Sequence, residues 1–549
     1  MMRRMSWRNE RNLYKRKDDS GKEVISIYSA DKPLRVYERS YWWSDKWDPM
    51  DHGKEYDFSK PFFEQFRELL YSVPAVSIFN SNPVNSDYCN HSGYMKDCYL
   101  AFASWECEKV LYSDRALFSK DSLDLYAADK CELCYEAVDS SESYKLFFSQ
   151  QCISCSESYF LFDCRNCRYC FGCVGLRNKQ YYIFNQPYTK EEYEEKLKSL
   201  NLGSFDSLSS FYEKFSKIKT SYPIKFARVT NSINSVGDNI QNVKNCFHCF
   251  GMKEAENCKY LAHGFDIKDS YDGFGIGLCE LLYEGIDTGE KGAFKQRFSV
   301  VVYASSDTHY CFNCDGSHNL FGCIGLRNKQ YCILNKQYSR EEYEKTLPRI
   351  VSHMSDTPYI GKNGRVYKYG EFFPIELSPF AYNETIAQNY FPLSKKEALE
   401  KGYEWEDSEE KNYATTIDAE NLPDVISDVT NHILKETVSC MHKGRCNEQC
   451  TTAFKIISQE LEFYRKLNLP LPRLCPNCRF KQRFKQSHPL TLWHRKCTCG
   501  GAISKNGVYK NQTTHLHGSK HCPNEFETSY APDRPEIVYC ESCYQSEVQ

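Results

Sequence analysis

A segment of 27 residues occurs twice in this chain, 150 residues apart. Residues 171–197 read FGCVGLRNKQYYIFNQPYTKEEYEEKL and residues 321–347 read FGCIGLRNKQYCILNKQYSREEYEKTL, which are identical at 18 of 27 positions. A duplication of this strength indicates that one structural unit was copied, so the chain is expected to build the same lobe twice. This constrains the fold more than the composition does.

Small thiol and hydroxyl side chains recur at regular intervals within the first lobe. Ser122, Cys134, Ser143, Cys155 and Cys164 follow one another in steps of 12, 9, 12 and 9. A β-solenoid needs such a repeat, because each coil stacks similar residues inward and buries its faces only against neighbouring coils. The sequence therefore predicts two β-solenoid lobes with an apparent repeat of 21 residues.

The two copies also end alike. Residues 189–192 (Thr-Lys-Glu-Glu) and 339–342 (Ser-Arg-Glu-Glu) are capping boxes, so a short helix is expected to close each stack. The polar hexapeptide Leu-Arg-Asn-Lys-Gln-Tyr precedes them, identical at 176–181 and 326–331. It could bind a ligand, but a closing turn of the lobe also explains its identity.

The thiols of the lobes have two interpretations. The densest run, spaced CxxCxxCxxC as in a metal or iron–sulfur site, consists of Cys164, Cys167, Cys170 and Cys173. The aligned residues of the second copy are Cys314, Ser317, Leu320 and Cys323. Since the second lobe dispenses with the two middle thiols, small inward-facing side chains are the favoured explanation.

The predicted chain is mainly β, with two duplicated β-solenoid lobes, short capping helices and flanking zinc-ribbon domains. The expected parts are a ribbon-like domain at 1–85, lobe 1 at 86–200, a linker at 201–235, lobe 2 at 236–350, a mixed α/β linker region at 351–439 and two zinc ribbons at 440–549. Within the linker region, the acidic run at 404–410 is expected to be solvated.

The C-terminal cysteines have the spacing of metal ligands. Cys446 and Cys450 precede Cys475 and Cys478, with a helix-like insert at 454–467 between the pairs. Two such pairs suit the tetrahedral thiolate coordination that zinc prefers. Three residues, rather than the usual two, separate the first pair, so Cys446 is the least secure ligand and Cys440 is its possible substitute.

A second zinc site is expected downstream. Seventeen residues separate Cys522 from Cys540 and two separate Cys540 from Cys543, which supplies three ligands. We assign His517 as the fourth ligand; the alternatives are His515, His521, Cys499 and Cys497. This surplus of ligands favours a closed, structural site over a catalytic one, which would keep an open position.

The N-terminus echoes this second ribbon. Residues 23–42 align with residues 525–544 around the pattern Tyr-x-x-Asp-Lys/Arg-Pro, which places Ser20, Glu38 and Tyr41 opposite Cys522, Cys540 and Cys543. We expect a degenerate, metal-free ribbon that keeps its hairpin. Burial of its tryptophans would supply the missing stability; they are Trp42, Trp43 and Trp47.

Several longer motifs resemble a known family. QELEFYR at 459–465, LPLPRLCPNC at 469–478 and YAPDRPEIVYCESCY at 530–544 are similar to zinc-ribbon proteins of candidate-phylum bacteria, as are SWRNER at 6–11 and SDKWDP at 44–49. The resemblance spans most of the chain and implies zinc, not a reaction. Family members tend to keep cysteines in the N-terminal ribbon, where this chain has none.

Charge is distributed unevenly along the chain. Residues 463–524 contain twelve Lys/Arg and no Asp or Glu, and residues 1–17 contain seven basic residues against Glu10 alone. Cations interleaved with aromatic rings suit RNA or single-stranded DNA. The predicted contacts are Arg479, Lys481, Arg483, Phe484, Lys485, Trp493, Arg495 and Lys496. Alternatively, the basic ends fold back on the acidic middle.

Motifs typical of enzymes are missing from the sequence. Walker, HExxH and GxSxG motifs are absent, and the glycines of 273–277 fit a solenoid turn. We therefore expect a non-catalytic protein with two structural zinc ions that binds nucleic acid, or else a protein scaffold using the solenoid lobes. A metal or redox enzyme is the third possibility. The odd cysteine total and the lack of apolar runs of roughly 18 residues indicate a cytoplasmic protein without membrane spans.

Overall fold

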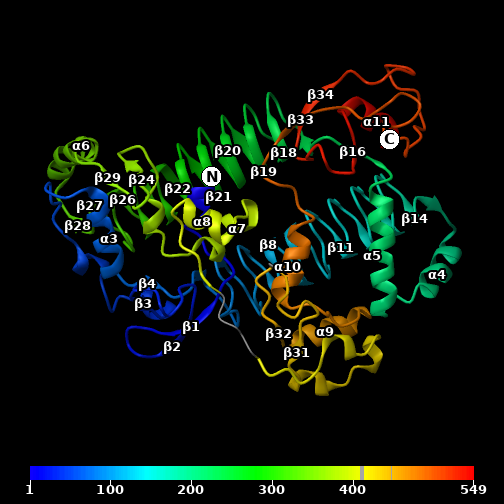
Figure 1. Cartoon of the computed structure of the whole chain (residues 1–549), viewed down its shortest axis with the longest axis horizontal. Helices are drawn as coiled ribbons and strands as arrows, with labels where there is room; N and C mark the ends of the chain where they lie inside the picture. The colour runs from blue at the N-terminus through cyan, green and yellow to red at the C-terminus, as the bar shows by residue number, and fades with distance from the viewer. Residues whose placement is uncertain (408–412, 447, 549) are drawn as a thin grey trace.

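The computed structural model describes residues 1–407, 413–446 and 448–548. It is mainly β, with 22% helix and 32% strand, and parallel strands stack into two β-solenoid lobes (Figure 1). The predicted fold class is confirmed. Residues 408–410 of the acidic run predicted as solvated linker lie outside the described residues.

Lobe 1 extends from β5 (Asn80–Ser81) to the closing helix α4 (Lys190–Ser199). Its other strands are β6 (Ser92–Gly93), β7 (Glu108–Leu111), β8 (Asp114–Leu117), β9 (Lys120–Leu123), β10 (Tyr126–Asp129), β11 (Tyr144–Phe147), β12 (Ser156–Tyr159), β13 (Arg168–Phe171), β14 (Gln180–Ile183) and β15 (Gln186–Pro187). The predicted capping box starts α4, because the Thr189 hydroxyl accepts from the Glu192 amide at 3.2 Å.

Lobe 2 extends from β17 (Val229–Thr230) to the closing helix α6 (Arg340–Asp356), which begins at the second predicted capping box. Its other strands are β18 (Val236–Gln241), β19 (Phe247–Glu256), β20 (Lys259–Lys268), β21 (Tyr271–Glu280), β22 (Tyr283–Arg297), β23 (Val300–Tyr303), β24 (Ser306–His309), β25 (Phe312–Asp315), β26 (His318–Phe321), β27 (Gln330–Ile333) and β28 (Lys336–Gln337). The glycines of 273–277 lie in β21, within the solenoid.

Most coils contain twelve residues, so the predicted 21-residue repeat is wrong; in lobe 2 the pairing of β17 with β18 is offset by 11 residues and that of β22 with β23 by 14. Leu111 pairs with Leu123, and Phe147 with Tyr159, in parallel strands offset by twelve. Buried residues face inward at every third position; examples are Cys98, Ala101, Ser104 and Cys107. Steps of 12 and 9 are both multiples of this three-residue spacing, which explains the pattern that suggested 21.

The residue before most inward residues takes a left-handed backbone conformation. Examples in lobe 1 are Asp97 (φ 53°), Leu100 (φ 49°) and Ala103 (φ 48°). This conformation costs most residues roughly 1–2 kcal/mol, whereas Asn, Asp and Gly adopt it more easily. Lobe 2 opens with asparagines at such positions; they are Asn231, Asn234, Asn239, Asn242 and Asn245.

Inward thiols and hydroxyls connect successive coils. The Ser104 hydroxyl donates to the Phe102 carbonyl at 2.8 Å and accepts from the Ala116 amide at 3.1 Å. Cysteine does the same: the Cys98 thiol donates to the Lys96 carbonyl at 3.3 Å. Small polar side chains therefore satisfy backbone groups that would otherwise be unpaired inside the lobe. This accounts for the abundance of Ser and Cys in both lobes.

Two ribbons of similar form join the lobes. At the N-terminus, β1 (Tyr14–Lys17) pairs with β2 (Glu23–Ser26), and at the C-terminus β33 (Trp493–Lys496) pairs with β34 (Glu525–Thr528). β3 (Val36–Tyr37) then pairs with β4 (Ala75–Val76) at the entry to lobe 1. Correspondingly, β35 (Ile537–Tyr539) pairs with β16 (Pro223–Lys225) at the entry to lobe 2. The predicted alignment thus extends to the strand pairing.

Each ribbon also contacts the exit of the other lobe, through the arginine of the duplicated hexapeptide. Arg327 of lobe 2 donates to the Ser44 carbonyl at 3.2 Å and lies 5.3 Å from the buried Trp42 ring of the N-terminal ribbon. Arg177 of lobe 1 donates to the Tyr544 hydroxyl of the C-terminal ribbon at 2.8 Å. The hexapeptide is therefore a docking point within the protein.

The helices that lead into the lobes repeat this pattern. Phe62 of α3 (Phe62–Ser72) packs 5.0 Å from Phe321 in lobe 2, and Phe211 of α5 (Phe205–Lys219) packs 5.1 Å from Phe171 in lobe 1. Helix α3 precedes lobe 1 and packs on lobe 2, whereas α5 precedes lobe 2 and packs on lobe 1. The two halves are therefore joined at both junctions, each by a ribbon and a helix.

Candidate metal centres

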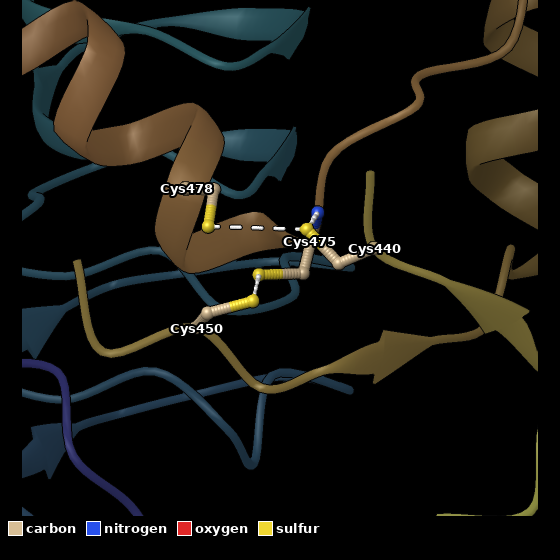
Figure 2. Close-up of side chains that lie close together, drawn as sticks. All are labelled: Cys440, Cys450, Cys475 and Cys478. Atoms are coloured by element: carbon tan, nitrogen blue, oxygen red, sulfur yellow. Dashed lines mark hydrogen bonds between the residues drawn. The ribbon is translucent and has the colours of Figure 1, made fainter. Parts of the chain in front are cut away.

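Four cysteines converge beside lobe 1 (Figure 2). Cys440 follows β31 (Val438–Ser439), Cys450 precedes its antiparallel partner β32 (Ala453–Phe454), and Cys475 caps α10 (Pro476–Phe484), which carries Cys478. Their sulfur atoms all lie within 4.8 Å of one another. The hairpin and the helix N-terminus thus present the four thiols to one point.

The separations fit a tetrahedral metal ion. The sulfur atoms of Cys440 and Cys478 are 3.9 Å apart, as are those of Cys450 and Cys475. Metal–sulfur bonds of about 2.3 Å in a tetrahedron would place the sulfurs about 3.8 Å apart. Hydrogen bonding with the thiols of Cys440, Cys450 and Cys478 lowers the pKa of Cys475 far below its ordinary value. This group can therefore hold a metal ion.

Cys446, which was predicted as a ligand, lies outside this group. Its sulfur is 3.7 Å from that of Cys478, but its other close neighbours are His442 and Glu448. Cys440, the predicted substitute, takes the fourth position because the Cys475 amide donates to its sulfur at 3.3 Å. The spacing of the predicted ligands identified the other three.

The second group comprises Cys497, Cys522, Cys540 and Cys543, with ligand atoms within 4.8 Å of one another. The sulfurs of Cys522 and Cys540 are 3.8 Å apart, again matching a tetrahedral edge. Cys497, directly after β33, occupies the position assigned to His517. The hydrogen bond with the Cys497 thiol lowers the pKa of Cys540 to about 3, which favours the ligating thiolate.

His517 belongs to an adjacent group. Its Nε2 atom lies 3.2 Å from the sulfur of Cys543, beside Cys499 and His515. His517 thus lies outside the group that contains Cys522 and Cys540, because the β33–β34 pairing brings Cys497 to Cys540 instead; the Cys540 amide donates to the Cys497 sulfur at 3.2 Å.

The inward cysteines of lobe 1 have a different environment. Each of the CxxCxxCxxC thiols is buried and donates to a backbone carbonyl two residues earlier. They are Cys164, Cys167, Cys170 and Cys173. The four groups of closely spaced metal-ligating atoms among the described residues do not include them.

Two arginines predicted to contact nucleic acid are buried within the protein. Arg479 pairs with Asp124 at 2.9 Å and with Glu460 at 3.1 Å, and Arg483 pairs with Asp124 at 2.7 Å. The two arginines are 3% and 1% exposed. Because α10 lies against lobe 1, these charges neutralise lobe carboxylates and are not presented to a partner.

The other predicted contacts vary in exposure. Phe484 packs 5.6 Å from Tyr126 of lobe 1, the Lys481 ammonium donates to Asn389, and Arg495 donates to the Tyr530 carbonyl at 3.3 Å. Trp493 is partly buried in β33. Lys485 and Lys496 are exposed and pair with Glu448 and Glu525.

The N-terminal arginines also fold onto the lobes. Arg4 pairs with Glu284 at 3.0 Å and Arg8 with Asp287 at 3.1 Å, both in lobe 2. Arg11 pairs with Asp114 of lobe 1 at 3.4 Å. This is the alternative in which basic ends fold back on the acidic middle.

The degenerate ribbon uses its substituted positions locally. The Glu38 carboxylate caps α2 (Arg39–Trp42) by accepting from the amides of Ser40 at 3.1 Å and Tyr41 at 3.2 Å. The Ser20 hydroxyl donates to Asp18 at 2.6 Å. Trp42 is 1% exposed and packs 4.8 Å from Trp43, so aromatic packing occupies the end of this ribbon.

Comparisons with known proteins do not identify a family. No family model and no curated protein matches the chain. Among solved structures, a proposed acetyltransferase from Desulfovibrio desulfuricans G20 is similar over 52% of this chain and 84% of its own, at 10% identity and a TM-score of 0.10. So low a score carries no argument. Within the described residues, no helix is long and apolar enough to span a membrane.

Proposed function

We propose that this protein is a non-catalytic scaffold whose two solenoid lobes are held together by zinc-bound segments. The main support for this proposal is that both cysteine groups lie in segments that contact the lobes. Cys475 and Cys478 fix the start of α10, whose next turn inserts Arg479 and Arg483 beside lobe 1. Four-thiolate coordination suits zinc, and a closed site of this kind contributes to folding and not to chemistry.

The second cysteine group supports the same role. Cys540 directly follows β35, which pairs with β16 at the entry to lobe 2, while Tyr544 reaches Arg177 at the exit of lobe 1. An ion bound there would brace both lobes at one junction. Zinc would thus stabilise two separate contacts with lobe 1, one made by α10 and one made by the C-terminal ribbon.

The lobes offer surfaces for a protein partner or a second copy of the chain. Tyr271 and Tyr283 lie on successive coils of lobe 2, are 40% and 38% exposed, and have ring centroids 6.0 Å apart. A cavity of about 460 Å³, lined in part by Trp43, Trp105 and Tyr303, opens between the N-terminal ribbon and the lobes. Exposed apolar rows and aromatic cavities are typical of interaction sites.

The test compares assembly of the full chain with that of variants. Native mass spectrometry of tagged protein from its own cells should show a self-assembled or heteromeric complex. Tyr271→Ser with Tyr283→Ser should reduce the complex, whereas Tyr144→Ser, also 40% exposed but on lobe 1, should not. A monomer without a stoichiometric partner would contradict the proposal.

Nucleic-acid binding is the competing outcome. Retention on single-stranded RNA at low salt, abolished by Lys485→Ala with Lys496→Ala, would favour it over the protein scaffold. The exposed lysines are the relevant residues, because Arg479 and Arg483 are already paired with Asp124.

A further inference from the structure

We propose that the C-terminal ribbon holds a second zinc ion, bound by Cys499, His515, His517 and Cys543. Cys543 also belongs to the group of Cys497, Cys522 and Cys540, so its thiolate would bridge two ions. This inference rests on the proposal that zinc occupies the neighbouring four-cysteine group. It changes that group from a single closed site into a dinuclear centre.

The four ligand atoms converge from three segments. The Cys499 sulfur lies 3.1 Å from Nδ1 of His515, and the Cys543 sulfur lies 3.2 Å from Nε2 of His517. All four lie within 4.8 Å of one another. Two thiolates and two imidazoles form one of the ligand sets that tetrahedral zinc adopts.

The histidines are oriented as metal ligands. Nε2 of His515 lies 2.8 Å from a Glu547 carboxylate oxygen, and both side chains are at most 1% exposed. Nδ1 of His517 lies 2.7 Å from the Lys520 carbonyl. Each ring therefore donates a hydrogen bond to an oxygen acceptor through one nitrogen. Its other nitrogen, which carries the lone pair, points towards a cysteine sulfur. Carboxylate–histidine–metal arrangements use this geometry.

The surroundings hold these partners in place. Glu547 lies one helical turn after Cys543 in α11 (Glu541–Val548) and accepts from the Gln512 amide and the Tyr509 hydroxyl, each at 2.8 Å. The Asn511 side-chain amide donates to the Cys499 sulfur at 3.2 Å. This hydrogen bond holds the Cys499 sulfur in place beside His515.

Metal counting tests the assignment. The full chain, purified with zinc and analysed by mass spectrometry of the metal, should contain three ions: one in the group near lobe 1 and two in the C-terminal ribbon. His517→Asn should lower the content by one ion. His521→Asn is the matched control, because this exposed neighbouring histidine belongs to none of the groups, and it should leave the count unchanged.

Cobalt substitution tests the bridge independently of folding. Two Co²⁺ ions sharing the Cys543 thiolate should couple magnetically, so the paramagnetic resonance intensity should fall well below the cobalt content. His517→Asn should remove the coupling and restore full intensity per ion. Two zinc ions in the parent chain, unchanged by His517→Asn, would overturn the dinuclear centre while leaving the scaffold proposal intact. No zinc at all would overturn both.

Discussion

At the scale of single residues, the chain uses much of its basic charge internally. Asp124 is 0% exposed and receives both Arg479 and Arg483, which come from a segment more than 350 residues later. Buried charges require a partner, because burial removes their hydration. The acid-free stretch that resembles a nucleic-acid surface is therefore partly the counterpart of acidic lobes.

Replacing Asp124 should be strongly destabilising. Asp124→Ala leaves two buried guanidinium groups without this carboxylate, and breaking a buried ion pair from one side costs about 3–5 kcal/mol. We expect a matching fall in the free energy of unfolding from urea titration followed by circular dichroism. Glu108→Ala removes the solvent-exposed partner of Lys96 and should lower the free energy of unfolding far less than Asp124→Ala does. Equal effects of the two changes would refute this.

His309 should make stability depend on pH. Burial, followed by the charge of Arg297, lowers the pKa of His309 to about 4. The unfolded chain, with a pKa near 6.5, therefore binds more protons between these values, so stability is lost as pH falls from about 6.5 to 4. The shift corresponds to about 3 kcal/mol.

The measurement is the free energy of unfolding at pH 7 and pH 4. His309→Gln keeps an acceptor for Arg297 and a donor for Tyr369, which lie 2.9 Å from the ring nitrogens, and should reduce the acid-induced loss. The exposed His318→Gln is the control and should leave it unchanged. An unchanged pH dependence in His309→Gln would exclude this origin.

At the scale of elements, the sequence predicted that the lobes are built from stacked coils but not the length of one coil. The duplication predicted two lobes and the capping boxes predicted both closing helices. The coil length could not be read from the spacing of Ser and Cys, because aliphatic residues also occupy inward positions; examples are Ala101, Val110 and Leu125. The missing information lay in two runs of asparagines spaced by three residues, Asn231 with Asn234 and then Asn239, Asn242 and Asn245.

Prediction of the candidate metal-binding cysteines from the sequence had a similar limit. Spacing along the chain identified the three ligands of each group that lie on local turns. The remaining ligands, Cys440 and Cys497, reach their groups through strand pairing and backbone contacts with distant segments. Such an approach depends on tertiary structure, so it cannot be obtained from spacing alone.

Inward hydroxyls should be replaceable by thiols but not by methyl groups. Ser104→Ala leaves the Ala116 amide without its acceptor inside the lobe, at a cost of about 1–3 kcal/mol. Ser104→Cys should retain most of the stability, since cysteines form equivalent contacts elsewhere, as the Val110 amide does with Cys98 at 3.5 Å. Melting temperatures measured side by side check this. A Cys variant as unstable as the Ala variant would contradict the equivalence.

At the scale of the whole molecule, the lobes are joined at two junctions by unlike ribbons. The C-terminal ribbon carries two groups of metal-ligating residues, whereas the N-terminal ribbon ends in packed tryptophans. Their connections are otherwise alike: the Phe226 amide donates to the Tyr539 carbonyl, and the Ser77 amide to the Tyr37 carbonyl, each at 3.0 Å. With zinc bound as proposed, the chain allows a metal-stabilised junction to be compared with one stabilised by aromatic packing.

Removal of the metal should open one junction and spare the other. Chelation would remove the ion that ties the cysteines of the C-terminal ribbon together, and structural zinc contributes directly to folding free energy. Hydrogen exchange at β35, β16 and α11 should therefore accelerate at least about tenfold, which corresponds to ~1.4 kcal/mol. Exchange at β3 and β4 should stay within twofold, because their ribbon is held by Trp42 and its neighbours. Added zinc should restore the slow rates. Equal acceleration at both junctions would show that the ribbons are not independent, and no change at either would show that the metal does not hold the lobes together.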